Sequence, residues 1–276
     1  MRPEIIFHLA AQALVRRAHR DPLTTYATNV TGTAKVLEAV RSFPFVRTIV
    51  VVTSDKVYEN NNEDRPFRED DRLGGSEPYG VSKASAEMVT AAFRQSLGGS
   101  GPAIATARAG NVVGGGDWGE DRLLPDAMRA FRSGMPLEIR NPRSTRPWQH
   151  VLDPLSGYLL LAERMTQGDP KWRTAWNFGG EESATVADMA ERIVSHWNSA
   201  GGHPPAKWRA APEANAPYEA RSLRLDSTKA VTELGWMRRL PLAQALEWTV
   251  DWHIQQVRGT AMEGPSGAMI DAFMRT

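Results

Sequence analysis

The sequence predicts an α/β protein built on a doubly wound parallel sheet, and three observations lead to this fold class. Strand-like apolar segments at 4–11, 45–54 and 102–114 alternate with helix-like segments at 21–43 and 77–97. The segment at 45–54 is almost continuously apolar, as expected for a parallel strand that is covered on both faces. The order strand, helix, strand, helix, strand is typical of doubly wound sheets.

The two helices of the first half have recognisable ends. Asp21 is a suitable cap for the helix at 21–43, and Pro22 fits its first turn because no N–H is needed there. A glycine pair that begins at Gly98 closes the helix at 77–97. Each helix therefore connects two strands that we expect to run in the same direction.

The second half of the chain is less regular and predicts a smaller α/β lobe. Helical patterns occur at 121–134, 151–165, 185–201 and 226–236, and a short strand-like segment occurs at 174–180. Asp226 is the expected cap of the helix at 226–236, and Gly201 ends the helix at 185–201. Proline-rich connections at 204–217 separate these last two helices.

Length, charge and composition exclude several classes of function. The 276 residues suffice for one large domain or two small ones, and 41% hydrophobic with 24% charged residues is typical of globular proteins. The net charge of +1 is dispersed, without a basic block that would indicate nucleic acid or a membrane surface as a partner. No apolar run reaches the ~18 residues that span a bilayer. Because there is no cysteine, no signal-peptide layout and no ligand spacing among the six histidines, we expect a cytoplasmic protein without a metal site.

Four polar residues, TSDK at 53–56, follow the apolar segment at the point where its strand ends. Parallel α/β sheets bind ligands at the carboxyl ends of their strands, so these residues indicate a functional site. Only six of the 33 basic residues are lysines, which suggests that Lys56 and Lys83 stand where an ammonium is needed. The alternative for Asp55 and Lys56 is an ion pair at the end of a strand.

Tyr79 and Lys83 lie four residues apart on a predicted helix, so their side chains share one face. A nearby ammonium favours the phenolate form of tyrosine, which makes Tyr79 a candidate base for a hydroxyl proton. Taken alone, the same spacing also fits a solvated helix face. Ser54 ends the preceding strand, and its hydroxyl is a candidate to bond the same substrate oxygen.

The strand-end Ser54 followed by Y-x-x-x-K at 79–83 resembles the extended short-chain dehydrogenase/reductase superfamily. FHLAA at 7–11 and TNVTGTAKVLEA at 28–39 are similar to that superfamily's fourth strand and the helix after it. The resemblance implies a Rossmann-type fold that binds NAD, with Tyr79 as base and Lys83 bonded to the nicotinamide ribose. The cofactor contacts that it implies are Leu9, Ala10, Ala11, Thr28, Thr53, Tyr79 and Lys83.

Further motifs resemble one family within that superfamily, the CDP-glucose 4,6-dehydratases. TSDKVY at 53–58 has lysine where the dTDP- and GDP-hexose dehydratases have glutamate. RAGNVVGGGDWGEDRLLPD at 108–126, RPWQHVLDPLSGYLLLAE at 146–163 and LRLDSTKAVTELGW at 223–236 are similar to the same family. The resemblance covers nearly the whole chain.

This second resemblance implies NAD-dependent conversion of CDP-D-glucose to CDP-4-dehydro-6-deoxy-D-glucose. The implied catalytic residues are Ser54, Asp55, Lys56, Tyr79 and Lys83. Tyr79 takes the C4 hydroxyl proton, Lys56 removes the C5 proton and Asp55 protonates the departing C6 hydroxyl. Lys56 must then be neutral and Asp55 protonated. Two alternatives are that Asp55 and Lys56 share one proton, or that Lys56 only positions a water.

The resemblance also implies how the partner CDP-glucose is bound. The substrate-binding residues by analogy are Asn111, Arg122, Leu123, Arg140, Asn141 and Arg146. Arg140 and Asn141 fall where the base is held, and an arginine fork suits a diphosphate. Trp118 is the tryptophan expected nearest the ligand, whereas His150 fits a substrate site or the core equally well. The family further implies a homodimer through the helices at 21–43 and 77–97, without nucleic acid or membrane partners.

One motif of the superfamily does not occur in the 276 residues, the dinucleotide fingerprint G-x-x-G-x-x-G after a first strand. The glycine-rich segment at 110–119 follows a late strand instead. We therefore expect the chain to begin at the family's fourth strand, roughly 60–75 residues into an N-terminally incomplete sheet. Residues 1–113 would be the remainder of the NAD-binding domain, with 147–173 returning to it, and 114–276 would form mainly the nucleotide-sugar lobe.

The absence of the dinucleotide fingerprint from the 276 residues leaves several expectations for the activity of the chain. One expectation is a truncated, poorly active dehydratase that does not bind NAD alone. The alternatives are another NAD-dependent sugar-nucleotide epimerase or dehydratase, and a non-catalytic remnant that binds a nucleotide sugar.

Overall fold

The computed structural model describes residues 2–60, 65–98, 101–180, 182–212 and 223–276, which fold into two compact units. Unit 1 comprises Met1–Gly110, Pro154–Gly179 and Leu223–Met237, and unit 2 comprises Asn111–Asp153, Gly180–Ser222 and Arg238–Thr276. The return of 223–237 to unit 1 was not anticipated from the sequence. The ligand-binding roles expected of the two parts stay predictions.

Unit 1 is built on a parallel sheet, which confirms the predicted fold class. Its strands are β1 (Ile5–His8), β2 (Thr48–Val52), β3 (Ala103–Ala109) and β7 (Ala175–Phe178), in the order β1-β2-β3-β7. All three neighbouring pairs are parallel, with His8 opposite Val51 and Val52 opposite Ala107. The carboxyl ends of β1, β2 and β3 therefore meet at one edge.

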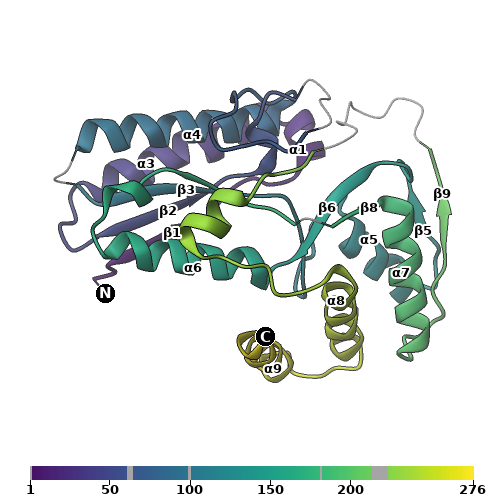
Figure 1. The fold of residues 1–276 in the computed structure, drawn as a ribbon. Coiled ribbons are helices and arrows are strands. Elements are labelled where there is room, and N and C mark those ends of the chain that lie inside the picture. Colours follow the sequence, from purple (N-terminus) through teal and green to yellow (C-terminus); the bar gives the residue numbers. More distant parts are fainter. Residues whose placement is uncertain (1, 61–64, 99–100, 181, 213–222) are drawn as a thin grey trace. The chain divides into compact units, whose positions relative to one another are not determined.

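Helices cover both faces of this sheet (Figure 1). The helices are α3 (Gly32–Val40), α4 (Pro78–Leu97) and α6 (Leu152–Thr166). Ile49 and Val51 of β2 pack with Leu37 of α3 on one face. Val50 packs with Leu161 of α6 on the other. Because successive strand residues point to opposite faces, an uninterrupted apolar strand buries both of its faces.

The predicted helix at 21–43 is divided into shorter elements. They are α2 (Pro22–Tyr26), the π-helical turn η1 (Ala27–Thr31) and α3. They follow a short helix, α1 (Val15–Arg20), which was not expected from the sequence. The predicted cap is confirmed, because the Asp21 carboxylate accepts a hydrogen bond from the Thr24 N–H at 3.1 Å. The π turn is compatible with the sequence, which contains no proline after Pro22 in this run.

Two predicted helices of unit 1 agree with the observed structure to different degrees. Helix α4 begins one residue after the predicted start and ends at the predicted Leu97, and it is followed by Gly98, whose φ of 56° suits glycine. The predicted helix at 226–236 is largely a π-helical turn, η4 (Ala230–Leu234). Its predicted cap is confirmed, since Asp226 accepts a hydrogen bond from the Thr228 N–H at 2.8 Å.

Unit 2 combines short strands with four helices among its described residues. The elements are β4 (Asn111–Val113), α5 (Leu123–Arg132), β5 (Leu137–Ile139), β6 (Thr145–His150), β8 (Ser183–Thr185), α7 (Val186–Ser199), β9 (Trp208–Ala210), α8 (Leu242–Val257) and α9 (Glu263–Arg275). Strand β6 pairs with β4 in parallel and with β8 antiparallel, and β5 pairs with β9. The predicted strand at 102–114 is thus two strands, one in each unit.

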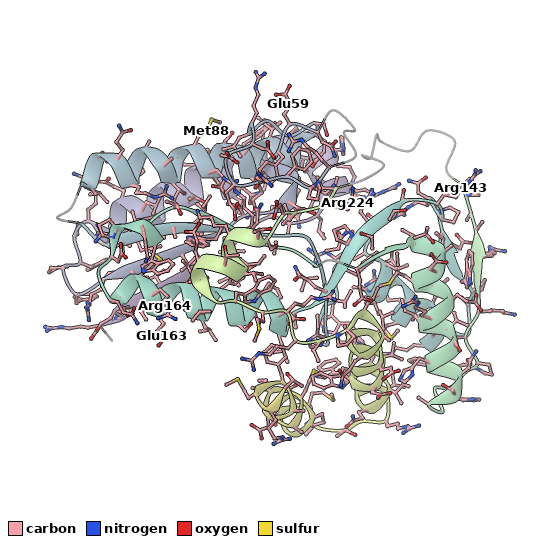
Figure 2. The ribbon with its side chains drawn as sticks, viewed as in Figure 1. Glu59, Met88, Arg143, Glu163, Arg164 and Arg224 are labelled. Atoms are coloured by element: carbon pink, nitrogen blue, oxygen red, sulfur yellow. The ribbon has the colours of Figure 1, made fainter. Side chains whose placement is uncertain are left out.

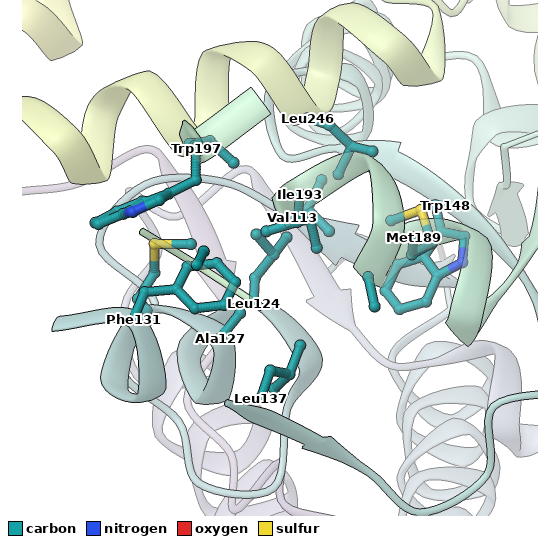
Figure 3. Packing of buried hydrophobic residues seen from close by; sticks show 14 of the residues in the cluster. Val113, Leu124, Ala127, Phe131, Leu137, Trp148, Met189, Ile193, Trp197 and Leu246 are labelled. Carbon is teal, nitrogen blue, oxygen red and sulfur yellow. The ribbon is translucent and has the colours of Figure 1, made fainter. Parts of the chain in front are cut away.

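The core of unit 2 lies between α5, α7 and α8 (Figure 3). Phe131 of α5 packs against Trp197 of α7 with ring centroids 5.4 Å apart, and Leu246 of α8 belongs to the same cluster. Unit 2 therefore has a hydrophobic core of its own. No helix in the described part of the chain is long and apolar enough to cross a membrane.

Candidate active site

The polar residues at the end of β2 form a compact turn in unit 1. The Ser54 hydroxyl accepts a hydrogen bond from the Lys56 N–H at 3.2 Å and begins a short 3-10 turn, η2 (Asp55–Val57). The same hydroxyl donates to the Asp55 carboxylate at 3.0 Å. Ser54 and Asp55 are 6% and 5% exposed, whereas Lys56 is half-buried. A solvated surface ion pair would not explain this burial.

Tyr79 and Lys83 are held against that turn by the start of α4. The Glu77 carboxylate caps the helix by accepting hydrogen bonds from the Tyr79 and Gly80 N–H groups at 2.7 and 2.8 Å. A Cβ on Gly80 would lie only 2.7 Å from the Lys56 carbonyl oxygen, so glycine permits the close approach of helix and turn. Tyr79 and Lys83 are 8% and 6% exposed. The structure therefore brings the five predicted catalytic residues into one region of unit 1.

Lys83 is a buried ammonium at the end of β2. Its Nζ donates to the Val52 carbonyl oxygen at 3.0 Å, the only hydrogen bond it makes to the described residues, so two of its three N–H donors remain. Burial lowers the pKa of Lys83 to about 8, although the nearby Glu87 carboxylate acts to raise it. His8, at the end of β1, also has a lowered pKa, because of burial and the neighbouring Lys83 charge.

Glu87 was not identified from the sequence, although it is central to this region. Its carboxylate accepts hydrogen bonds from Thr53 Oγ1 at 2.5 Å and Thr106 Oγ1 at 2.7 Å, and from the Nε and Nη2 of Arg108 at 2.9 and 3.0 Å. Burial acts to raise the pKa of Glu87, but Arg108 and these hydrogen bonds lower it. The sequence did contain a signal for Glu87, because this residue follows Lys83 by four residues on the same helix face.

The residues expected to contact the cofactor also belong to unit 1. Leu9 and Ala10 are exposed and Ala11 is half-buried, immediately after the carboxyl end of β1. Thr28 lies in η1 with an exposed side chain. Its neighbour Asn29 is buried instead, and donates to the Ser82 hydroxyl of α4 at 2.9 Å. The buried polar group of η1 is thus Asn29, and the role of the exposed Thr28 as a cofactor contact stays a prediction.

The six predicted substrate-binding residues all lie in unit 2. Asn111, in β4, has a buried side-chain Nδ2 that finds no hydrogen-bond partner among the described residues. Arg122, which precedes α5, is exposed and donates to the Asp117 carboxylate at 3.1 Å, and Leu123 is the first residue of α5. A buried amide donor without a partner is costly, so a ligand that accepts from Asn111 would compensate for that cost.

The remaining three residues follow β5 or lie in β6. Arg140 is half-buried and donates to the Asp121 carboxylate at 2.9 Å. Asn141 is exposed in the loop after it. Arg146, in β6, is half-buried and donates to the Thr145 carbonyl oxygen at 2.9 Å. The structure therefore places two guanidinium groups on adjoining segments of unit 2.

Two aromatic residues singled out in the sequence have different surroundings in unit 2. Trp118 is 46% exposed, and its ring lies 5.4 Å from that of His253 in an edge contact. His150 is fully buried, and its Nδ1 accepts a hydrogen bond from the Leu152 N–H at 3.3 Å. Burial lowers the pKa of His150 to about 4. The imidazole is therefore neutral, but its buried Nε2 finds no hydrogen-bond partner among the described residues, so a core role and a substrate-site role for His150 both stay predictions.

A pocket of about 510 Å³ lies elsewhere in unit 1, where α3, α4 and α6 end. Its lining includes Arg41, Arg47 and Arg173. The carboxyl ends of helices carry partial negative charge, and Arg47 already donates to the Thr166 carbonyl oxygen at 3.2 Å. We therefore attribute these arginines to the helix ends rather than to an anionic ligand. No group of three or more potential metal ligands occurs among the described residues.

Together, the buried groups of unit 1 supply what acid–base chemistry on a hydroxylated substrate needs. Ser54 is a hydroxyl for orienting a substrate oxygen, Tyr79 is a phenol that can exchange a proton, and Asp55 is a second proton-exchanging group. Lys83 brings positive charge, which favours developing negative charge nearby.

Comparison with known proteins reveals similarity along nearly the whole chain. A family model described as GDP-mannose 4,6 dehydratase matches residues 1–249. The CDP-glucose 4,6-dehydratase of Salmonella typhimurium is 43% identical over 269 residues, which cover 95% of this chain and 73% of that protein. The dTDP-glucose 4,6-dehydratase of Xanthomonas campestris is 26% identical, covering 91% of this chain and 73% of that protein. The solved structure of MoeE5 in complex with UDP-glucose and NAD is 26% identical, with a TM-score of 0.75 over 92% of this chain and 80% of MoeE5.

Proposed function

Because the chain belongs to the GDP-mannose 4,6-dehydratase family, we propose that it is an NAD-dependent dehydratase of CDP-D-glucose, a hydro-lyase that forms CDP-4-dehydro-6-deoxy-D-glucose. The observation that carries the proposal is the buried arrangement of Ser54, Asp55, Tyr79 and Lys83 in a chain 43% identical to a CDP-glucose 4,6-dehydratase. The substrate preference is supported by the difference between this identity and the 26% identity to a dTDP-glucose 4,6-dehydratase. The 43% identity to a CDP-glucose 4,6-dehydratase favours this reaction over the other expectations, which were a poorly active form, another epimerase or dehydratase, and a non-catalytic remnant.

The residues of unit 1 fit the nicotinamide half of NAD. Lys83 is buried, and two of its N–H donors make no hydrogen bond to the described residues, a donor set that suits the hydroxyls of a ribose. Leu9 is 50% exposed at the carboxyl end of β1, where an apolar side chain gains from cover by a ligand. The NAD bound in the similar MoeE5 structure supports this cofactor. We retain Leu9, Ala10, Ala11, Thr28 and Thr53 as proposed cofactor contacts.

In the proposed reaction, Tyr79 takes the proton of the C4 hydroxyl while Ser54 bonds the same oxygen. Lys83 stabilises the Tyr79 phenolate through its positive charge. When bound, NAD would supply hydride-acceptor chemistry at C4 and hydride-donor chemistry at C6. The ketone formed at C4 acidifies the C5 proton, which Lys56 removes as a base. Asp55 gives its proton to the departing C6 hydroxyl, so that water leaves, and protonated Lys56 returns a proton to C5 when hydride is delivered to C6.

Unit 2 supplies the proposed contacts to the CDP part. The buried Nδ2 of Asn111 supports a ligand with a hydrogen-bond acceptor at that position. Arg122 and Arg146 carry guanidinium groups of the kind that bind diphosphate oxygens in pairs. The assignment of Leu123 to the same subsite, and of Arg140 and Asn141 to the base, comes from the family resemblance.

The proposal includes a homodimer that uses α2, α3 and α4. Two large apolar side chains are exposed on these helices, Leu23 of α2 at 80% and Met88 of α4 at 56%. Figure 2 shows Met88 pointing away from the body of unit 1. Large apolar side chains on neighbouring helices are common at contacts between subunits. We also propose that the protein is located in the cytoplasm.

Turnover of four sugar nucleotides tests the proposed function directly. The protein is incubated with NAD and with CDP-, dTDP-, UDP- or GDP-glucose, and loss of one water is followed by mass spectrometry. We expect dehydration of CDP-glucose with a kcat/KM at least about tenfold above that of the others. Preference for another base would overturn the proposed substrate, and no dehydration of any of the four would overturn the proposed reaction.

A further inference from the structure

Two side chains of α4 hold two successive residues at the end of β2. Lys83 donates to the Val52 carbonyl oxygen at 3.0 Å, and Glu87 accepts from the Thr53 hydroxyl at 2.5 Å. The next residue along the chain is Ser54. The helix and the strand end are therefore connected by hydrogen bonds from two successive turns of α4 to two consecutive residues, and not only by packing.

The Glu87 carboxylate is in turn fixed by β3. The Thr106 hydroxyl and two nitrogens of Arg108 donate to it, so four hydrogen bonds reach its two oxygens. Glu87, Thr106 and Arg108 are 4%, 0% and 3% exposed. Bidentate pairing with a guanidinium fixes direction as well as distance. The carboxylate consequently has one orientation in which all of its donors are satisfied.

Stability alone does not account for this buried ion pair. Removing a carboxylate and a guanidinium from water is costly, and apolar residues of similar volume often give equal stability in their place. The presence of this ion pair in the core therefore points to a requirement that the side chains bonded to it keep a defined geometry. Glu87 lies on the same face of α4 as Tyr79 and Lys83, at the same spacing of four residues.

We propose that Glu87 is a positioning residue for the dehydratase reaction, fixing Thr53 and thereby the Ser54–Asp55 turn against the helix that carries Tyr79 and Lys83. This inference rests on the proposed function. Ser54 and Tyr79 must reach the same substrate oxygen, and a misplacement of about 1 Å in such an arrangement costs about 100-fold in rate. Glu87 does not need to touch the substrate to have this effect.

The first test is Glu87→Gln, which keeps the shape of the side chain and removes its charge. We expect kcat with CDP-glucose to fall about 10- to 100-fold while KM changes less than about twofold, because the substrate-binding groups are untouched. Thr90→Val is the matched control. Thr90 is fully buried on the same helix and donates to the Ala86 carbonyl oxygen at 2.7 Å, so its loss removes a buried hydrogen bond and should leave kcat near the wild-type value.

Two further variants keep the test decisive if Glu87→Gln does not fold with Arg108 unpaired. Glu87→Asp retains the negative charge for Arg108 but withdraws the carboxylate by one methylene. Thr53→Val leaves the Glu87–Arg108 pair intact, and because Thr53 is also a proposed cofactor contact, all variants are assayed at saturating NAD. Each should lower kcat with an unchanged KM for CDP-glucose. A folded variant of the three whose kcat is within about twofold of wild type, or whose loss lies entirely in KM, would overturn the positioning role.

A second readout does not depend on turnover. Backbone amide exchange at 53–57 reports the order of the turn, since the Thr53 N–H donates to Ala107 at 2.8 Å and the Lys56 N–H to Ser54 at 3.2 Å. We expect faster exchange there in Glu87→Asp and Thr53→Val than in Thr90→Val. If the wild-type protein dehydrates no nucleotide sugar, the proposed function fails, and exchange alone then decides whether Glu87 orders the turn. Unchanged exchange would refute the inference in either case.

Discussion

Lys83 remains charged in spite of its burial because opposing influences act on it. Burial lowers its pKa to about 8, and the nearby Glu87 carboxylate limits that fall. Most of the ammonium therefore stays protonated at neutral pH, as the proposed stabilisation of a Tyr79 phenolate requires. His8 beside it has a lowered pKa and is neutral at the same pH, so it adds no second positive charge.

Tyr79→Phe tests the proposed base. The phenyl ring preserves the packing of a side chain that is 8% exposed, while the proton acceptor is lost. We expect kcat with CDP-glucose to fall about 10²- to 10⁴-fold, the usual cost of removing a general base. Steady-state kinetics measures the effect, with Tyr26→Phe on α2 as the control. Near-normal turnover of Tyr79→Phe would leave this tyrosine with a structural role only.

Lys56→Met tests the second proton transfer. Methionine approximates the length of the lysine side chain and removes its amine, so oxidation at C4 should proceed and removal of the C5 proton should stop. We expect the bound dinucleotide to accumulate in its reduced form, with little C5 exchange in deuterated water and a product rate at least about 100-fold below wild type. Lys35→Met, on the exposed side of α3, is the control. Exchange at the wild-type rate would exclude Lys56 as the base.

At the scale of elements, the start of α4 defines the candidate site. Glu77 caps the helix, Gly80 allows it to approach the Lys56 carbonyl, and Lys83 bonds the end of β2. The same helix presents Met88 on its outer face (Figure 2). One element therefore carries proposed catalytic groups inward and a proposed subunit contact outward.

Met88→Glu tests the proposed dimer. A carboxylate buried in an apolar contact would lose its hydration, so we expect the dimer dissociation constant to rise at least about tenfold, or about 1.4 kcal/mol. Sedimentation at several concentrations measures the change. Met274→Glu is the matched control, because Met274 is 67% exposed on α9 in unit 2. Equal behaviour of both variants would argue against a dimer through α4.

Local signals explain which elements were predicted. Asp21 and Asp226 were identified as caps because their side chains bond the backbone only two or three residues away. Helix α8 was missed although its buried residues follow helical spacing, since Thr249 and His253 place polar groups on its buried face. The Glu87–Arg108 pair was missed because it depends on contact between a helix and a strand, which no local pattern determines.

The local parts of the predicted site could be located from the sequence, whereas its tertiary contacts could not, and the roles of its residues stay predictions. TSDK and Y-x-x-x-K are each contiguous on one element, so the strand end and the helix face were readable from the sequence. Asn29, the buried polar residue of η1, was not identified, although it directly follows Thr28, the expected cofactor contact. A π turn changes the direction of side chains relative to an α-helix, which a spacing of 3.6 residues does not anticipate.

At the scale of the molecule, buried histidines make unit 2 sensitive to acid. Burial lowers the pKa values of His150 and His253 to about 4. An unfolded chain takes up these protons near pH 6.5, so between about pH 6.5 and pH 4 the unfolded state binds more protons than the folded one. The free energy of unfolding therefore falls as pH decreases, by about 3 kcal/mol for each histidine.

Urea unfolding at several pH values between about 7 and 4, followed by tryptophan fluorescence, measures this loss. The loss due to one histidine is isolated by comparing wild type with His150→Gln, which does not titrate. We expect the variant to lose less stability over this range than wild type does, by about 3 kcal/mol. Equal losses would mean that His150 takes up its proton in the folded state.

The three-segment composition of unit 1 has a consequence for folding during synthesis. Strand β3 ends at Ala109, but its partner β7 begins only at Ala175. The turn η4 follows later still, and its Ala230 belongs to the same hydrophobic cluster as residues of β3. While the ribosome makes the intervening residues, the nascent sheet presents β3 with an unpaired, apolar edge. Such edges favour pairing with other chains. Unit 1 is complete only after the segment at 223–237 has emerged, so it is vulnerable to aggregation until then.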